Sequence, residues 1–352
     1  MQVKNFWLSV DKGNIASYVH LTTGPVKTLT LRILGKVSPW DKSTANSNNN
    51  NDQHSQYLSH GGVQIRTRDT RSMFDASVSY TDHSVAPADQ ESYDACARFR
   101  FELVLPEDLT HYGSIVIQAP LLTVETNKLQ NIKFDHLDFA SIVGGSLETK
   151  GPLQADKMIA HFTTGDIQVN SIQTATEGRP LVVKLTTTTG FNSLDALITA
   201  IPENRTHKID LYTDQGMIEL SVRPTVETSS SSSGSPPLGQ IKIHAHSKIG
   251  IIDNKIMLAG AGQVLLLDPY TETGTVDTAA SDFFLGQLEL TAKTGDVEVK
   301  EADGSASTIV YMYKGAGLTI GQRGRWWLVV ARLRARSTLA STGRTTLTFS
   351  KD

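Results

Sequence analysis

The stretch Thr164-Gly165-Asp166-Ile167 places a glycine between a polar residue and the start of a short strand-like run. Close copies occur at Thr273-Gly274-Thr275-Val276 and Thr294-Gly295-Asp296-Val297, with a looser copy at Gln215-Gly216-Met217-Ile218. Glycine takes positive φ angles more easily than other residues, so it suits a tight corner between two strands. The copies therefore predict corners of one repeated kind.

These glycines recur at a restricted interval from residue 145 onward. The successive gaps are 20, 25, 26, 34, 24, 21 and 22 residues, and the gap of 34 contains a ten-residue Ser-rich insertion at 228–237. A period in the low twenties, built of strands and turns, is typical of a β-solenoid, in which each coil covers its neighbour's apolar face. The predicted corner glycines are Gly145, Gly165, Gly190, Gly216, Gly250, Gly274, Gly295 and Gly317.

Short runs rich in threonine and β-branched residues lie between Gly, Asn, Asp and Pro residues along most of the chain. No stretch has a convincing 3.6-residue period, which would indicate a helix. We therefore predict an all-β protein, a parallel β-solenoid of about eight coils. Threonines are expected to stack between coils, with their hydroxyls bonding along the ladder. An antiparallel sandwich with evenly spaced hairpins is the alternative.

The first 110 residues lack this interval and contain longer alternating runs, such as 29–33 and 99–103. One-sided alternation favours an antiparallel sheet with one wet face, which would cap the open edge of the solenoid. The predicted organisation is an N-terminal β region at 1–110 with an Asn/Ser-rich loop at 43–56, a solenoid at 111–322 with the insertion at 228–237, and basic C-terminal strands at 323–352.

The composition excludes several classes of protein. The only cysteine among the 352 residues is Cys96, so an intrachain disulfide framework or a cysteine metal cluster is excluded. The longest wholly apolar run, 326–331, is far shorter than the roughly 20 residues that cross a bilayer. Residues 1–10 have no basic segment leading into an apolar stretch, so we expect no signal peptide or anchor in this sequence.

Charge is distributed unevenly along the chain. The formal net charge is −3, yet residues 304–351 contain eight basic residues and no acidic one. Within this segment Arg332, Arg334 and Arg336 alternate with Ala331, Leu333 and Ala335. A strand would place these three guanidinium groups on one face, where they can bind carboxylate, sulfate or phosphate groups of a polymer.

Two tryptophans precede this stripe, and in a strand one of them would pack inward while the other would be available for stacking on a sugar or a base. The alternative is that the arginines protect an exposed last strand from edge pairing and neutralise the acidic body. Nucleic acid is disfavoured, because aromatic and basic residues are not interleaved. The ligand-binding candidates are Arg323, Arg325, Trp326, Trp327, Arg332, Arg334 and Arg336.

Catalytic and metal-binding patterns are weaker. Asp166 and Asp296 lie in corners five coils apart, roughly 24 Å by strand spacing, whereas glycosidase carboxylates lie about 5 to 9.5 Å apart. Each is expected to bond the backbone of its own turn. His244 and His246 share one side of a strand, but no third metal ligand is evident. We predict no enzyme, metal or cofactor; the alternative is a carbohydrate-active enzyme, a polysaccharide lyase or glycoside hydrolase, whose acids converge from loops.

The run Leu105-Pro106-Glu107-Asp108-Leu109, followed by short strands and the repeated Thr-Gly-Asp corners, resembles the "putative adhesin" family of bacteria and, in divergent form, of fungi. The resemblance covers roughly residues 99–319. It implies a parallel β-solenoid and a noncatalytic binding or scaffold module at the cell surface or envelope. We expect a polymer or protein partner, such as an anionic polysaccharide or a cell-envelope component.

Overall fold

The computed structural model contains strands, turns and loops, without a helix, in the residues that it describes. Among them, no helix is long and apolar enough to cross a membrane. The Asn/Ser-rich loop at 43–56 and the insertion at 228–237 lie outside the described residues. Those residues are 5–10, 15–39, 61–69, 73–82, 95–199, 201–202, 204–225, 239–258, 264–281, 286–292, 297–300, 309–315, 318–323, 331–337 and 345–350.

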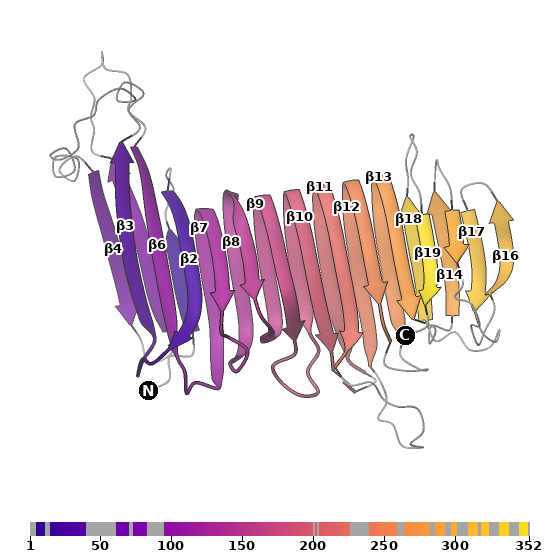
Figure 1. Ribbon diagram of the computed structural model, residues 1–352, viewed down its shortest axis with the longest axis horizontal. Helices are drawn as coiled ribbons and strands as arrows, with labels where there is room; N and C mark the ends of the chain where they lie inside the picture. Colours follow the sequence, from indigo (N-terminus) through magenta and orange to yellow (C-terminus); the bar gives the residue numbers. More distant parts are fainter. Residues whose placement is uncertain are drawn as a thin grey trace, which may run out of the picture.

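Seven long strands of 17 to 21 residues form the middle of the molecule. Each pairs in parallel with the next in chain order, which produces the regular array of Figure 1. The prediction of a parallel β-solenoid is confirmed, and the antiparallel-sandwich alternative is wrong for these strands. They are β7 His111–Asn127, β8 Lys133–Lys150, β9 Leu153–Gln173, β10 Val182–Ile198, β11 Thr206–Pro224, β12 Gln240–Ile256 and β13 Leu265–Ser281.

A column of glycines forms the corner of the coils from β8 to β13. The φ angles lie between 126° and 154° at Gly145, Gly165, Gly190, Gly216, Gly250 and Gly274, as the sequence predicts. A Cβ atom at any of the last five would lie only 1.6 to 1.9 Å from the carbonyl oxygen of the preceding glycine in the column. Each corner therefore needs glycine for its backbone angle and also for its close contact with the next coil.

The corner divides each long strand into a first limb before the glycine and a second limb after it. Buried residues alternate along both limbs, so the core lies between them. Ile209 of the first limb pairs with Ile243, and Ile218 of the second limb pairs with Ile252; all four are fully buried. Because apolar side chains recur in register, each coil covers the core of its neighbour.

Small hydroxyl residues stack just before the corner, at Thr187, Thr213, Ser247 and Thr271. All four are fully buried. The Ser247 hydroxyl donates to the Gly216 carbonyl at 3.3 Å, whereas the Thr187 and Thr213 hydroxyls have no hydrogen-bond partner among the described residues. Stacking is therefore confirmed, but the predicted ladder of bonded hydroxyls is wrong in this column.

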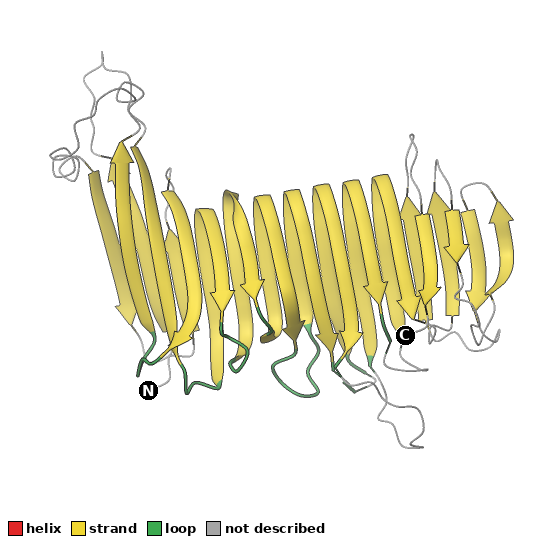
Figure 2. Cartoon of the chain, in the orientation of Figure 1, coloured by secondary structure: helices red, strands yellow, loops and turns green. Residues whose placement is uncertain are grey.

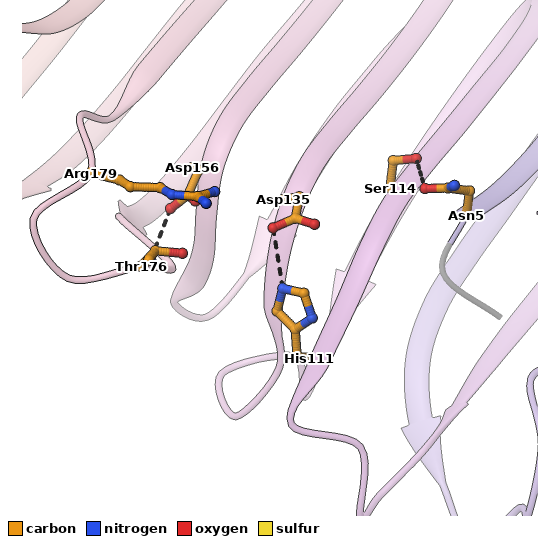
Figure 3. Close-up of polar contacts among 7 residues, drawn as sticks. All are labelled: Asn5, His111, Ser114, Asp135, Asp156, Thr176 and Arg179. Carbon is orange, nitrogen blue, oxygen red and sulfur yellow. Dashed lines mark hydrogen bonds and ion pairs between the residues drawn. The ribbon is translucent and has the colours of Figure 1, made fainter. Parts of the chain in front are cut away.

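The edge of the rod opposite the corners carries the connections between coils (Figure 2). Figure 3 shows how polar contacts fasten this edge. The Asp156 carboxylate accepts the Thr176 N–H at 2.8 Å and lies 3.2 Å from the Arg179 guanidinium, which holds the loop after β9 against that strand. His111 and Asp135 join β7 to β8 at 3.2 Å.

The N-terminal strands close one end of the stack in an order that differs from the chain order. β1 (Asn5–Val10) and β2 (Ile15–Gly24) pair in parallel with β7. On their other side they pair in parallel with β5 (Met73–Asp82) and β6 (Ala95–Pro106), respectively.

Beyond these strands, β3 (Thr30–Pro39) and β4 (Gly61–Asp69) are antiparallel to β6 and β5. In β3 and β6 the core side chains alternate with exposed ones, as in Phe99, Arg100 and Phe101. The predicted antiparallel pairing is therefore present, but only in the outermost layer.

The C-terminal strands close the other end in a related way. β18 (Ala331–Ser337) and β19 (Thr345–Ser350) pair in parallel with β13. They also pair in parallel with β14 (Gly286–Ala292) and β15 (Val297–Lys300), respectively. The chain therefore places its last described strands between two earlier coils.

The outermost strands at this end are β16 (Ile309–Gly315) and β17 (Leu318–Arg323), which are antiparallel to each other. These two strands therefore do not continue the parallel repeat of the coils. Residues 293–296 and 316–317, which include Gly295 and Gly317, lie outside the described residues.

Candidate binding face

The predicted basic stripe lies on an interior strand. Strand β18 carries Arg332, Arg334 and Arg336 and pairs with β13 on one side and β14 on the other. The alternative that these arginines protect an exposed edge strand is therefore wrong. Arg323 is the last residue of β17, and Arg325, Trp326 and Trp327 lie outside the described residues.

The register places Arg332 and Arg336 beside outward-facing positions of β13. Arg336 pairs with Tyr270 of β13 and with Thr291 of β14, and Arg334 pairs with Glu289 of β14. Arg332 pairs with Leu266 of β13. The row of arginines thus continues columns that begin on the regular coils.

The outer side of the first limbs of β11, β12 and β13 is called the first-limb face. Its residues alternate with the core residues of these strands, and charged side chains dominate it. Neighbouring strands lie about 4.8 Å apart, so residues in register form columns along the rod. The face consists of Lys208, Asp210, Tyr212, Asp214, Lys242, His244, His246, Lys248, Leu266, Asp268, Tyr270 and Glu272.

Three aromatic rings form one column of this face. The ring centroids of Tyr212 and His246 lie 5.1 Å apart with an interplanar angle of 88°. Those of His246 and Tyr270 lie 4.7 Å apart at 70°. Edge-to-face packing of this kind is favourable beyond the area that it buries. Arg336 occupies the next register position of the same column.

The central ring of the column is shielded from water. Burial is the main cause that lowers the pKa of the His246 imidazole, so the ring is neutral at pH 7. Its Nε2 atom is buried and has no hydrogen-bond partner among the described residues. His246 therefore acts as packing between the two tyrosines.

A tight polar cluster fixes one end of the aromatic column. The Lys248 ammonium lies 2.6 Å from the Asp214 carboxylate and 5.9 Å from the centre of the Tyr212 ring. The Tyr212 hydroxyl donates to the same carboxylate. Hydrogen bonds from Lys248 and Tyr212 lower the pKa of Asp214, so its charge is held at neutral pH. This cluster limits the rotation of the Tyr212 ring.

The remaining columns of the face consist of charged side chains, His244 and Leu266. His244 Nδ1 lies 3.7 Å from the Asp268 carboxylate, and Lys208 is in register with Lys242. No group of three or more His, Cys, Asp or Glu residues in the described part of the chain is arranged to hold a metal ion. His244 and His246 therefore have separate partners, an acid and two aromatic rings.

A second column that the sequence analysis missed lies on the second limbs. Glu219, Asp253 and Asp277 are in register on β11, β12 and β13. Partial burial, with the charges of Asp277 and then Glu219, raises the pKa of the Asp253 carboxyl. These three residues are called the acidic column.

Both columns have a signal in the sequence, a constant spacing from the corner glycines. The acidic residues each lie three positions after a corner glycine, as Glu219 does after Gly216. The aromatic residues each lie four positions before one, as Tyr212 does. Neither spacing appears in the short Thr-Gly-Asp motif itself, so the motif alone does not indicate the two columns.

Of the two corner aspartates in the repeated motif, Asp166 has a structural role. Asp166 Oδ1 accepts the N–H of Phe191 at 3.0 Å, so it bonds the corner of the next coil instead of its own turn. Asp296 lies outside the described residues. Asp166 therefore joins two coils.

The sequence matches no protein-family model and no curated protein. Among solved structures, the chain is similar to a putative adhesin from Bacteroides fragilis, at 8% identity and a TM-score of 0.33, over 99% of this chain and 93% of that one. It is also similar to a putative cell adhesion protein from Clostridium sporogenes, at 7% identity and a TM-score of 0.20, over 99% and 94% of the two chains. At such low scores, function has to be argued from this chain's own residues.

Proposed function

We propose that this chain is a noncatalytic, adhesin-like module of the cell surface or envelope that binds an anionic polysaccharide along the first-limb face. The observation that carries the proposal is the aromatic column of Tyr212, His246 and Tyr270, which continues in register to Arg336. Rings and guanidinium groups are the two side-chain types that suit a charged sugar polymer, because rings stack on sugars and guanidinium forks bind acidic groups.

The rod geometry suits many weak contacts with a long ligand. Successive coils repeat each column position about every 4.8 Å, so a polymer lying along the rod would meet equivalent positions in order. Contacts that are individually weak then add up, because each one raises the local concentration for the next. The glycine corners and the continuous core hold the positions fixed, which limits the conformational entropy lost on binding.

The first-limb face itself has three lysines and four acidic residues, so the excess positive charge that an acidic polymer needs comes from the arginines of β18, which continue its columns. Asp214 binds Lys248, and Asp268 lies beside His244, whereas Lys208 and Lys242 are in register as two like charges. Like charges side by side are unfavourable without an anion, so an acidic polymer would relieve their repulsion. Attraction of this kind also speeds association at low salt.

A binding experiment tests the proposal. The affinity of the full chain for heparin and for neutral dextran is measured at salt concentrations from about 50 to 300 mM. We expect heparin to bind and dextran to bind much more weakly, with an affinity for heparin that falls steeply as salt screens the charges. Changing Arg332, Arg334 and Arg336 to Ser should lower the affinity at least tenfold and flatten the salt dependence. Tyr270→Ser should lower the affinity without flattening it.

The matched control changes three exposed lysines outside this face to Ser: Lys27, Lys128 and Lys255. It removes the same charge from the molecule, so a general electrostatic effect would weaken binding equally in both triple variants. Equal loss, or an affinity for heparin that does not change with salt, would contradict the proposal. Thermal unfolding of each variant shows whether the fold is kept.

One observation favours a second candidate, a carbohydrate-active enzyme. The carboxylates of the acidic column lie on adjacent strands, about 4.8 Å apart by strand spacing, which approaches the roughly 5 Å separation of retaining glycosidases. The raised pKa of Asp253 beside two other carboxyls fits a proton donor. A reducing-sugar and unsaturated-product assay over a polysaccharide panel tests this candidate, and turnover that disappears in Asp253→Asn would support it over the noncatalytic proposal.

A further inference from the structure

A pocket of about 560 Å³ lies near the N-terminal end of the rod, where the glycine column stops. It is remote in sequence from the first-limb face and belongs to other strands. Residues of β2, β3, β6, β7 and β8 contribute to it. Its lining consists of Ala16, Ser17, Tyr18, Leu34, Arg98, Phe99, Arg100, Leu121, Leu122, Thr123 and Gly145.

The sequence of β7 explains why the surface opens here. Leu122 takes the place that glycine has in the later coils, and it pairs with Gly145. Leu122 is fully buried while the preceding Leu121 remains 37% exposed. Ala16 pairs with Leu121 on one side and with Arg98 on the other. A small side chain between two large ones leaves a depression in the outer surface.

The walls of the pocket are mostly apolar. Leu34 is 62% exposed, and Leu121 also faces solvent. Tyr18 adds its ring, which lies 5.6 Å below the Arg100 guanidinium. Exposed apolar side chains around a depression are a recognised mark of a ligand site.

The charged groups of the pocket lining are the two arginines Arg98 and Arg100. Arg98 is exposed and has no ion pair with a described residue. Ser17 is only 3% exposed, and its hydroxyl has no hydrogen-bond partner among the described residues. Ser17 alternates with Ala16 and Tyr18 and faces the core beside Phe99 and Leu122. A ligand in the outer depression therefore meets the arginines and not this hydroxyl.

Two carboxylates near the pocket have other described partners, so they do not neutralise these arginines. Glu102, two residues after Arg100 on β6, lies 3.0 Å from the Arg32 guanidinium. Glu125 accepts a hydrogen bond from the Tyr18 hydroxyl at 2.5 Å and one from the Lys150 ammonium at 2.7 Å. These two bonds lower the pKa of Glu125 and use its oxygens. The pocket therefore keeps a positive rim above an apolar wall.

We propose that this pocket binds a small amphipathic acid, an apolar chain or ring that carries one carboxylate or sulfonate group. The apolar body lies against Leu34, Leu121 and the Tyr18 ring, and the acidic group lies between Arg98 and Arg100. This small-molecule site is separate from the polymer-binding face and does not depend on it.

The fluorescent probe 8-anilino-1-naphthalenesulfonate, titrated into the full chain, tests this site directly. We expect one probe per chain, displaced by octanoate or by 2-naphthoate. The neutral analogues 1-octanol and 2-naphthol should displace it at least tenfold more weakly. If only octanoate displaces the probe, the apolar part of the preferred ligand is an alkyl chain. If only 2-naphthoate displaces it, the apolar part is an aromatic ring.

Two variants locate the probe. Arg98→Gln should weaken probe binding at least tenfold, and Ala16→Phe, which fills the depression, should abolish it. Lys255→Gln removes the same charge at a remote exposed site, and Ile251→Thr removes an exposed apolar group at a corner; both should leave binding unchanged. Circular dichroism and thermal unfolding identify any variant that fails to fold, and the remaining variant then decides.

The proposal is overturned if no probe binds, if neutral analogues compete as well as the acids, or if Arg98→Gln binds like the unchanged protein. Loss of binding in Ile251→Thr would also overturn it, because the probe would then report the corner and not the pocket. Probe binding and heparin binding are measured separately and with different variants. The pocket and the proposed function can therefore be refuted independently.

Discussion

The regular coils from β8 to β13 and the two ends of the rod are built by different rules. In the regular coils each strand pairs with the next one along the chain, and a glycine fixes every corner. At the N-terminal end, β1 and β2 lie between β7 and the strands β5 and β6. At the C-terminal end, β18 and β19 lie between β13 and the strands β14 and β15. Antiparallel strands then form the outermost layer.

This difference shows that propagation and closure are separate problems for a solenoid. A coil in the middle needs only to match its neighbours, which a short repeated motif can specify. An end coil must also limit further pairing, because an open parallel edge would add other chains. Reversing the strand direction in the outermost layer interrupts the parallel repeat at both ends.

Removing the last two described strands should have the largest effect. Deletion of 331–352 leaves β13 without β18 and β19 and separates it from β14 and β15. We expect concentration-dependent association, measured by light scattering, because parallel edges become unpaired. Deletion of 191–216 is the control, because it joins Gly190 directly to Met217 and so removes one coil. It should leave a shorter monomeric rod. Association of both variants, or of neither, would contradict the distinction between ends and middle.

A single corner glycine should matter almost as much. In Gly216→Ala the new Cβ would lie 1.8 Å from the Gly190 carbonyl oxygen, at a φ of 149°. We expect a loss of about 4 kcal/mol or more in the free energy of unfolding, measured with denaturant. Gly178→Ala is the control, because φ is 70° but no atom lies within 4 Å; backbone strain alone should cost about 1–2 kcal/mol. Similar losses would show that contact between coils is unimportant.

The fully buried His207 fastens the start of β11 to the preceding coil. Its Nδ1 accepts the Leu181 N–H, and its Nε2 donates to the Thr199 carbonyl, both at 3.0 Å. Burial lowers the pKa of His207 from its usual 6.5 to about 4. The unfolded chain therefore binds a proton more readily, and stability should fall as pH drops from 6.5 toward 4, by about 3 kcal/mol.

Denaturant unfolding at several pH values measures this loss. His207→Gln should be less stable at pH 7 and should lack this part of the pH dependence. A variant whose stability still falls equally between pH 6.5 and 4 would show that other groups are responsible.

The acidic column should give the smallest effect. Asp253 lies between Glu219 and Asp277, and like charges in register are unfavourable. Asp253→Asn should therefore stabilise the protein at pH 7 by about 0.3–1 kcal/mol, measured by denaturant unfolding. Because the pKa of Asp253 is raised, the repulsion weakens as pH falls through that value, and the gain should disappear at acidic pH. Asp195→Asn, which breaks an ion pair with Arg223, should be neutral or destabilising.

The fold of the coils from β8 to β13 could be predicted because the residues that determine each coil lie close together in the sequence. The interval from Gly145 to Gly274 reports the length of each coil, and the positive φ angles explain why glycine is kept. The ends could not be predicted from that interval. The corner motif at Gly295 resembles the earlier ones, but which coil lies beside it depends on pairing between distant segments.

The sequence analysis proposed the arginines of the candidate site but not the aromatic column that lies beside them. Alternation correctly placed the three arginines at alternate positions of one strand, β18. Their neighbours, Tyr270 and Glu289, lie at sequence distances that no short pattern reports. The pocket was missed for the same reason, because Ala16, Arg98 and Leu121 become neighbours only through the order of the strands.

The sequence by itself determined that this chain is a β-solenoid with glycine corners, because each corner is set by backbone angles and contacts that repeat within about 25 residues. Only the tertiary structure decided how the stack is closed and which side chains share a column. These features depend on pairing between strands as far apart as β2 and β7, or β13 and β18, and the free energy of such pairing comes from core contacts that no local pattern contains.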